Sequence, residues 1–405
     1  MDRSRSWCSK LLVGLLAVSP AVAVTVPAGT ELELRLNSKV ASNASKPNDA
    51  VEAIVIAPLA VNGEFVVPAG STLRGTVRDA KPCPGAEEHA ILDLNFSELK
   101  IAGKSVKVAT QISEIENARE SVDEKGRIIG ILTSQTISGR MDSGIGRVIE
   151  KHGGLGDFLQ IAKGAVIKAS EGDIVYGPGV EFRAKLTKPV DLAAAGPGPA
   201  ANLRPVANQG ELENVAVKQP FQTVAQNPPK PSDITNLMFV GSEEALSNAF
   251  QKAGWSTAAA LSASSKLETF RAIAELRGYK EAPVSILMLD NRPPDLVFQK
   301  QNNTFAQRHH LRIWKRPDTF AGKPVWVCAA THDIGIDFSE QNRTFIHKID
   351  SQIDRERAKV VNDLLLTNLV ESLALVDRPA VPHHSQNATG DNLDTDGKIA
   401  VLILQ

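Results

Sequence analysis

The chain has few cysteines and no excess of charge of either sign. Of its three cysteines, Cys8 lies in the N-terminal segment, which leaves Cys83 and Cys328 in the rest of the chain. These two fall in different predicted modules and lack the spacing of a metal-binding motif, so neither a disulfide nor a cysteine metal site is expected. The formal net charge is −1, whereas proteins that bind nucleic acid carry a strong basic surplus. We therefore expect no nucleic-acid partner.

Long apolar runs are also absent after the N-terminus, so no transmembrane segment is expected in the mature chain. The first residues carry Arg3, Arg5 and Lys10, followed by the apolar stretch 11–18 and by Ala21-Val22-Ala23. A basic region, a short apolar region and an Ala-x-Ala site are the three parts of a secretory signal peptide. The apolar stretch is too short for a membrane anchor, which needs about 20 residues. We predict a signal peptide at 1–23 and an exported protein, periplasmic or extracellular, soluble or peripherally attached to the envelope.

The sequence contains no phosphate-binding loop, no nucleophile elbow, no dinucleotide fingerprint and no His-Glu-x-x-His motif. These absences exclude the enzyme classes that are defined by such motifs. The sequence identifies no cofactor, and whether the protein is an enzyme stays open.

Residues 24–190 have the alternation of β-structure. Glu31 to Leu36 alternates polar and apolar residues, and Asn62-Gly63 is typical of a hairpin turn between two apolar runs. Several short strands with regular turns predict an all-β barrel or sandwich. A Pro-Gly turn before an alternating strand recurs at 177–190, which predicts that this segment returns to complete the module. The Gly-rich stretch 130–168 has a partly helical pattern and is expected to be an insertion.

The turns Pro27-Ala28-Gly29 and Pro68-Ala69-Gly70, with the stretch from Leu36 to Gly75, resemble the β-barrel of TrbI-like conjugation and secretion proteins. The resemblance implies an envelope assembly module rather than an enzyme.

Residues 191–230 are rich in Pro, Gly and Ala, which predicts a semi-extended linker and a module boundary. A second module is expected at 231–405. Helical patterns at 243–252, 267–276 and about 351–376 alternate there with strand patterns from Val284 to Ile349 and at 398–404. The predicted fold class is therefore multidomain, with an N-terminal all-β barrel or sandwich and a C-terminal α+β module.

Several phrases spread over the second module form a recognisable set: Ala253-Gly254-Trp255, Asp290 to Gln299, Arg308 to Trp314, Pro324 to Val327, Ala329 to Asp333, His347 to Asp350, Asp354 to Arg357 and Thr395-Asp396-Gly397. With these phrases the module resembles the LssY C-terminal domain family, and the resemblance implies no established activity.

One polar cluster is a candidate site. Strand alternation and helix spacing are expected to gather its members on one sheet face near a helix N-terminus, where anions bind well. The members are His310, Arg312, His347, Asp350, Asp354 and Arg357. Three hypotheses stay open. His347 acts as general acid/base with arginines holding a phosphate; His310, His347 and Asp354 bind a metal; or the cluster is a structural network.

Other polar or reactive residues predict less. His309 falls on the strand face opposite His310 and is expected to be a surface or packing residue. His383-His384 is expected to be a solvated pair, and Cys328, Trp314 and Trp326 to fill the core. The favoured function is an exported envelope-associated binding or assembly protein, with an envelope protein or a lipid- or phosphate-bearing ligand as partner. The alternative is a hydrolase acting on a phosphate-containing envelope substrate.

Overall fold

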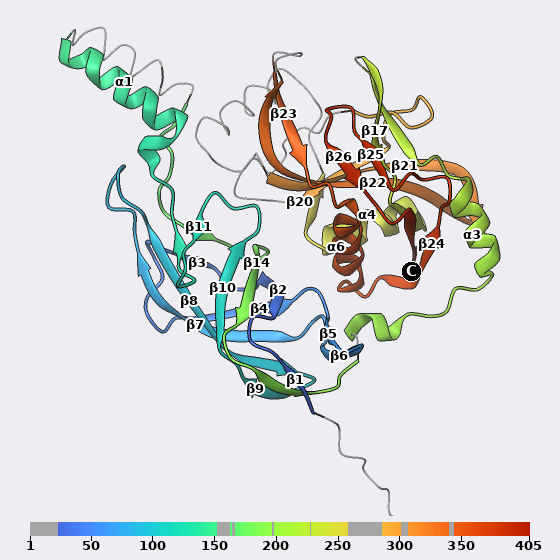
Figure 1. Cartoon of the computed structure of the whole chain (residues 1–405), viewed down its shortest axis with the longest axis horizontal. Coiled ribbons are helices and arrows are strands. Elements are labelled where there is room, and N and C mark those ends of the chain that lie inside the picture. Colours follow the sequence, from blue (N-terminus) through green and yellow to red (C-terminus); the bar gives the residue numbers. More distant parts are fainter. Residues whose placement is uncertain are drawn as a thin grey trace, which may run out of the picture.

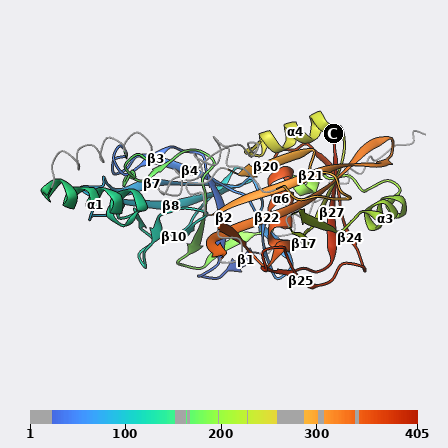
Figure 2. The same ribbon diagram turned by 90° about the horizontal axis from the view of Figure 1, so that it is seen from above.

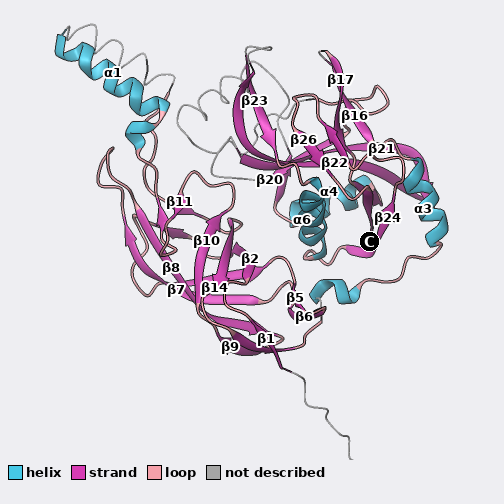
Figure 3. Ribbon diagram, in the orientation of Figure 1, coloured by secondary structure: helices cyan, strands magenta, loops and turns pink. Residues whose placement is uncertain are grey.

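The computed structural model describes residues 23–151, 163, 167–196, 198–226, 228–257, 286–300, 307–339 and 344–405. Nearly all of the predicted signal peptide, and the predicted helix at 267–276, lie outside these residues. Strands dominate the described chain, as Figure 3 shows, and they form two modules that lie side by side (Figures 1 and 2). The two-module prediction of a β-module followed by an α+β module is confirmed.

The first module is a nearly closed, barrel-like sheet with the strand order β10-β14-β2-β4-β7-β8-β12-β11, and β9 pairs with β8. These strands are β2 (Glu31–Leu36), β4 (Ala50–Val55), β7 (Thr72–Lys81), β8 (Ile91–Ile101), β9 (Lys104–Lys107), β10 (Thr110–Ile115), β11 (Ser121–Val122), β12 (Ile128–Ile129) and β14 (Glu181–Leu186). The Thr110 hydroxyl donates to the Phe96 carbonyl oxygen at 2.7 Å and so links β10 back to β8. The predicted return of residues 177–190 is confirmed, because β14 pairs with both β2 and β10.

Three short strand pairs complete the module. They are β1 (Ala23–Val26) with β15 (Val190–Ala193), β3 (Val40–Ala41) with β13 (Val175–Tyr176), and β5 (Leu59–Val61) with β6 (Glu64–Val67). The predicted hairpin turn lies between β5 and β6. Asn62 and Gly63 both have positive φ, 53° and 83°, which a two-residue turn of this kind requires.

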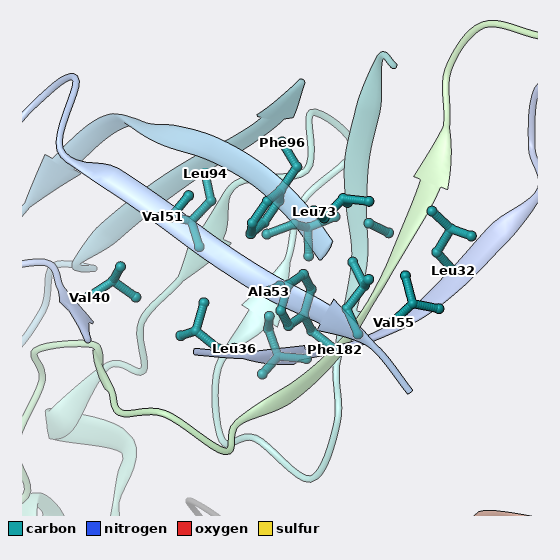
Figure 4. Close-up of a cluster of buried hydrophobic side chains, with 14 of the residues drawn as sticks. Leu32, Leu36, Val40, Val51, Ala53, Val55, Leu73, Leu94, Phe96 and Phe182 are labelled. Carbon is teal, nitrogen blue, oxygen red and sulfur yellow. The ribbon is translucent and has the colours of Figure 1, made fainter. Parts of the chain in front are cut away.

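The core of the first module follows from alternation along its strands. Leu32, Leu34 and Leu36 of β2 are buried while Glu31 and Glu33 face outward. Figure 4 shows Leu32 and Leu36 among the side chains of β4, β7 and β8. Phe96 stacks on Phe182, with 5.4 Å between the ring centroids. The predicted insertion contains η1 (Thr133–Gln135) and α1 (Ile137–Lys151), a helix that extends away from the barrel (Figure 1).

The second module is built on one mixed sheet with the strand order β19-β20-β21-β22-β18-β27-β24, and β23 pairs with β22. Its strands are β18 (Leu237–Val240), β19 (Trp255–Thr257), β20 (Leu296–Lys300), β21 (Gln307–Phe320), β22 (Lys323–Ser339), β23 (Thr344–Ile349), β24 (Val370–Asp377) and β27 (Lys398–Leu404). Only β18 and β27 run parallel among these pairs. Two short hairpin pairs lie outside the sheet, β16 (Gln222–Gln226) with β17 (Pro229–Ile234) and β25 (His384–Gln386) with β26 (Asn392–Asp394).

Helices cover both faces of this sheet. The helices α4 (Glu243–Lys252) and α6 (Ile353–Leu365) pack on one face, where Leu311, Ile313 and Trp326 are buried. The helix α3 (Gln209–Lys218) packs on the other face, with Trp314. The Ser242 hydroxyl accepts from the Ala245 amide and caps α4, as its sequence predicts. Among the described residues, no helix combines the length and the apolar character that crossing a bilayer requires.

Two segments differ from the sequence-based expectation. Residues 191–230 were expected to be a semi-extended linker, but they contain β15, η2 (Gly198–Asn202), α3, β16 and the first residues of β17. Leu212 and Ala216 of α3 are fully buried against the sheet, which a linker would not be.

The helix expected at 351–376 is shorter in the structure. The helix α6 ends at Leu365, because Asn368 takes a left-handed φ of 58°, and β24 begins at Val370. The apolar residues after Leu365 therefore belong to a strand.

Candidate functional site

The residues predicted to cluster fall into two groups. His310 and Arg312 are buried on the β21 face that carries Trp314, away from α6. His310 Nε2 is 3.0 Å from the Thr331 hydroxyl, and Arg312 pairs with Asp233 at 3.0 Å. The odd-numbered residues of β21 face α6 instead. The expected gathering of His310 and Arg312 at the start of that helix is therefore not what the structure contains.

Asp354 and Arg357 form the second group, at the start of α6. Arg357 makes two hydrogen bonds of 2.8 Å to the Asp396 carboxylate and pairs with Asp354 at 3.0 Å. Asp354 also accepts from the Thr395 hydroxyl at 2.7 Å. These contacts fasten α6 to the segment before β27. Asp350 lies nearby and accepts from the Gln352 amide. The backbone of His347 pairs with Ile336 across β22 and β23, and its side chain lies outside the described residues.

The interface between the modules contains a buried ionic network. Glu181 and Arg35 come from the first module, and Lys300, Lys359 and Asp363 come from the second. Lys300 Nζ is 2.5 Å from Glu181 Oε1 and 2.7 Å from Asp363 Oδ2, while Arg35 bridges the same two carboxylates. The Trp255 indole donates to Asp363 at 3.0 Å. This network joins the modules through charges that are largely excluded from water.

A second interface cluster lies next to it and is centred on His309. This ring is 2 % exposed and lies between two carboxylates, with Nδ1 2.7 Å from Glu356 Oε2 and Nε2 3.0 Å from Glu116 Oε1. Glu356 is on α6, whereas Glu116 directly follows β10 of the first module. His309 was expected to be a surface or packing residue; its side chain is buried, as that of a packing residue is, and it also pairs with a carboxylate from each module.

His332 stacks on His309. The two histidines are direct partners in the antiparallel ladder of β21 and β22, and their ring centroids are 4.1 Å apart. His332 Nε2 is 2.7 Å from Asn117 Oδ1 of the first module. Asn117 is buried and has a positive φ of 54°, so the chain turns there and directs both Glu116 and Asn117 at the histidine pair.

The charges of this cluster shift its pKa values in opposite directions. Burial would lower the pKa of His309, but Glu356 and Glu116 raise it to about 9. Burial would raise the pKa of Glu116, but the charges of His309 and Lys359 lower it to about 2. Burial and the charge of His309 together lower the pKa of His332 to about 3. At neutral pH His309 is charged and His332 is neutral.

A pocket of about 690 Å³ opens between the modules at this cluster. Its walls include Glu31, Glu33, Glu114, Glu116, Asn117, Arg183, His309, His332, Asp350, Arg355, Glu356 and Lys359, with apolar contributions from Ile56, Phe182, Ile334 and Ile353. Neither module forms this pocket alone. Within the described residues, the ligand atoms of Glu116, His309 and His332 lie within 4.8 Å of one another, a spacing compatible with a metal ion.

Residues 218–399 match the model of a protein family described as LssY C-terminus. The second module is an LssY C-terminal domain. The match begins at the end of α3, within the segment expected to be a linker, and ends in β27. No curated protein matches the chain. The LssY C-terminal domain contributes both histidines of the cluster, and the first module, outside the match, contributes Glu116 and Asn117.

The predictions for isolated residues have mixed outcomes. Trp314, Trp326 and Cys328 are buried in the core, as expected. His383 and His384 are exposed, and His384 pairs with Asp394 at 2.8 Å. Alternation alone does not identify His309 as part of a site, although His309, His332 and Glu356 all lie within residues 218–399, the stretch that matches the LssY C-terminus model. Glu116 carries no comparable signal, because its role depends on the packing of the two modules.

Proposed function

We propose that the protein is an exported, envelope-associated binding protein whose ligand site is the pocket between its two modules. The observation that supports this function is that both modules line a pocket of about 690 Å³. Small-molecule sites have volumes of roughly 300–1,000 Å³ and often lie between domains. The buried ion pairs at the interface hold the two walls in a fixed relation, so the pocket is formed before a ligand arrives.

The charge of the walls favours a cationic ligand. Six carboxylates line the pocket, together with Arg183, Arg355, Lys359 and the charged His309. All four cations are already paired: Arg183 with Glu114, Arg355 with Asp350, Lys359 with Glu181, and His309 with Glu116 and Glu356. In the described part of the chain, neither Glu31 nor Glu33 has an ion-pair partner. A ligand that carries amine or guanidinium groups would supply the missing positive charge.

Glu33 is the best-placed carboxylate for this contact. Desolvation, with the nearby charges of Glu116 and Glu181, raises the pKa of Glu33 more than Lys359 and Arg183 lower it, although the side chain remains accessible from the solvent. A bound cation would offset the cost of that desolvation by Coulombic attraction. A phosphate group would instead meet an acidic wall, so the same pocket gives less support to a hydrolase of phosphate-containing substrates.

Thermal melting with spermidine as the cationic probe tests this proposal. Ligand that binds the folded state alone stabilises it by about 2.7 kcal/mol at a concentration 100 times Kd. We expect the melting temperature of the full mature chain to rise with spermidine concentration, above the change that NaCl of equal ionic strength produces. Inorganic phosphate should give no such rise.

The variant Glu31→Gln/Glu33→Gln should lose the spermidine effect. The matched control is Glu87→Gln/Glu88→Gln, which removes the same charge from an exposed turn outside the pocket and should respond as the unchanged protein does. Equal stabilisation of all three proteins by spermidine would show that the cation does not bind in this pocket. Stabilisation by phosphate rather than spermidine would contradict the proposed ligand class.

A further inference from the structure

Three potential metal ligands meet on one wall of the pocket. His309 and His332 are neighbours in the ladder of β21 and β22, and their side chains leave the same face of the sheet. Glu116 approaches them from the first module, 3.0 Å from His309 Nε2. All three side chains line the pocket, and Glu116 and His332 are only half-buried, so an ion has access from solvent.

We infer that Glu116, His309 and His332 form a binding site for a divalent transition-metal ion, with zinc as the best-fitting ion. The inference deepens the proposed function and rests on it in one respect, since the pocket between the modules must admit the ion. The bound ion would place a positive charge next to the carboxylates that line the pocket.

The ligand types select the class of ion. Imidazole nitrogen and carboxylate oxygen suit zinc and its transition-metal neighbours, whereas magnesium and calcium prefer sites made of oxygen alone. Two histidines and one glutamate are a known ligand set for zinc, which then keeps a fourth position for water or another ligand. Here the fourth position would face the pocket.

The surroundings also match a metal site, because His309 has a carboxylate on its far nitrogen. Nδ1 lies 2.7 Å from Glu356 Oε2, so the carboxylate can hold the ring with Nε2 directed at the ion. Metal-binding histidines nearly always have such an outer partner, which fixes their tautomer and orientation. The other oxygen of Glu356, Oε1, is buried and has no hydrogen-bond partner in the described part of the structure.

The present spacing requires a small contraction. With metal–ligand distances of roughly 2.0–2.2 Å, tetrahedral ligand atoms lie about 3.4 Å apart, whereas these atoms lie within 4.8 Å. Glu116 currently hydrogen-bonds to the His309 nitrogen that would bind the metal, so the ion must displace the Nε2 proton of the charged ring, which is released to solvent. Because its side chain is 21 % exposed, the carboxylate can rotate and let the ion enter between them.

Zinc uptake by the metal-stripped mature chain tests the inference. Isothermal titration with Zn²⁺ should give about one equivalent per chain. Co²⁺ in its place should give visible bands without the charge-transfer band of a thiolate ligand, since neither Cys83 nor Cys328 lines the pocket. His332→Ala should weaken Zn²⁺ binding more than about 100-fold, beyond the 10–100-fold loss typical of an outer partner.

Two further variants keep the outcome clear. Glu116→Gln should also lose zinc affinity. It is the variant to use if His332→Ala fails to fold, because His309 keeps Glu356 as its ion-pair partner. His384→Ala is the control, because His383 and His384 form an exposed pair that can attract zinc on its own. Loss of zinc in His384→Ala alone would overturn the inference, as would absence of zinc binding by the unchanged protein.

The two proposals fail in different ways. Zinc binding without any spermidine effect would contradict the cationic organic ligand and leave the metal site. Stabilisation by spermidine without zinc uptake would contradict the metal site and leave the pocket as a ligand site, with Glu116 and His309 as a structural ion pair.

Discussion

Glu181 of β14 and Lys300 of β20 form a buried ion pair between the two modules, with 2.5 Å between Oε1 and Nζ. Their side chains are 6 % and 7 % exposed. Arg35, Lys359 and Asp363 complete a network in which Glu181 contacts three cations. Charges removed from water to this degree are stable only while they are paired. The network therefore couples the stability of each module to the presence of the other.

We predict that Glu181→Gln lowers the free energy of unfolding of the full chain by about 3–5 kcal/mol, the range for removing one partner of a buried ion pair. The substitution leaves Lys300, Lys359 and Arg35 with Asp363 as their remaining carboxylate. Urea denaturation at neutral pH measures the change.

The matched control is Glu52→Gln, in the same module. Glu52 pairs with Arg74 at 2.9 Å, but both side chains are exposed. Exposed pairs contribute at most about 1 kcal/mol. Equal losses in Glu181→Gln and Glu52→Gln would show that the interface network does not stabilise the fold.

Acid should weaken the same network. Burial would raise the pKa of Glu181, but Lys300, Lys359 and Arg35 hold it well below the ordinary value of 4.5, and the pKa of Asp363 is lowered by Lys300 and Lys359 in the same way. A carboxylate with a lowered folded pKa contributes stability above its unfolded pKa and loses it as the pH falls through the folded pKa. We therefore expect the unfolding free energy to decrease as the pH is lowered below 4.5.

The difference between the unchanged protein and Glu181→Gln should narrow over the same interval, because the unchanged protein also loses the Glu181 charge there. Urea denaturation of both proteins at neutral pH and at successively lower pH measures this difference. A constant difference down to the acid transition would mean that Glu181 keeps its ordinary pKa in the folded protein.

The sequence predicted local structure well where one physical signal dominates. Alternation in β2, the Asn62-Gly63 turn and the Ser242 cap all correspond to the structure, since each depends on neighbours in the chain. The predicted C-terminal end of the long helix lay beyond its true end at Leu365, because the apolar residues after Leu365 fit a helical face as well as a strand.

The candidate site was harder to predict because it depends on packing. Alternation correctly separated His309 from His310, but it does not indicate which strand face α6 will cover. Glu116 and Asn117 reach the histidines only because a turn in the first module docks against the second. No spacing within the chain encodes that contact.

A substitution at Arg312 tests whether the polar cluster predicted from the sequence has a structural role. Arg312 and Asp233 are 3 % and 7 % exposed and pair at 3.0 Å on the sheet face away from α6. We expect Arg312→Ala to lower the unfolding free energy by about 3–5 kcal/mol, because Asp233 stays buried with its main cation removed. Arg204→Ala is the control, since Arg204 is 78 % exposed in its pair with Glu371. A denaturation curve for Arg312→Ala equal to that of the unchanged protein would show that this ion pair is not needed for stability and would favour a functional role for the cluster.

Export predicts a defined new N-terminus. We expect the mature protein to begin at or next to Val24, as the Ala21-Val22-Ala23 site indicates. Cleavage there preserves the pairing of Val24, Thr25 and Val26 with β15, and Val26 stays buried in the core. N-terminal sequencing of the protein from the cell envelope or the medium gives the answer. An intact Met1 on that protein would contradict the prediction.

The last prediction concerns the connection between the modules. Within residues 191–230, α3 packs on the sheet of the second module and β16 pairs with β17, so the exposed residues before α3 are the better cleavage site. With a protease site inserted after Ala207, cleavage of the native protein should leave two fragments that elute together in gel filtration. The buried pairs of Glu181 and His309 hold them. Adding Glu181→Gln should separate the fragments, whereas adding Glu52→Gln should not. Separation of the unchanged fragments on cleavage alone would show that the covalent connection, and not the ionic interface, keeps the modules together.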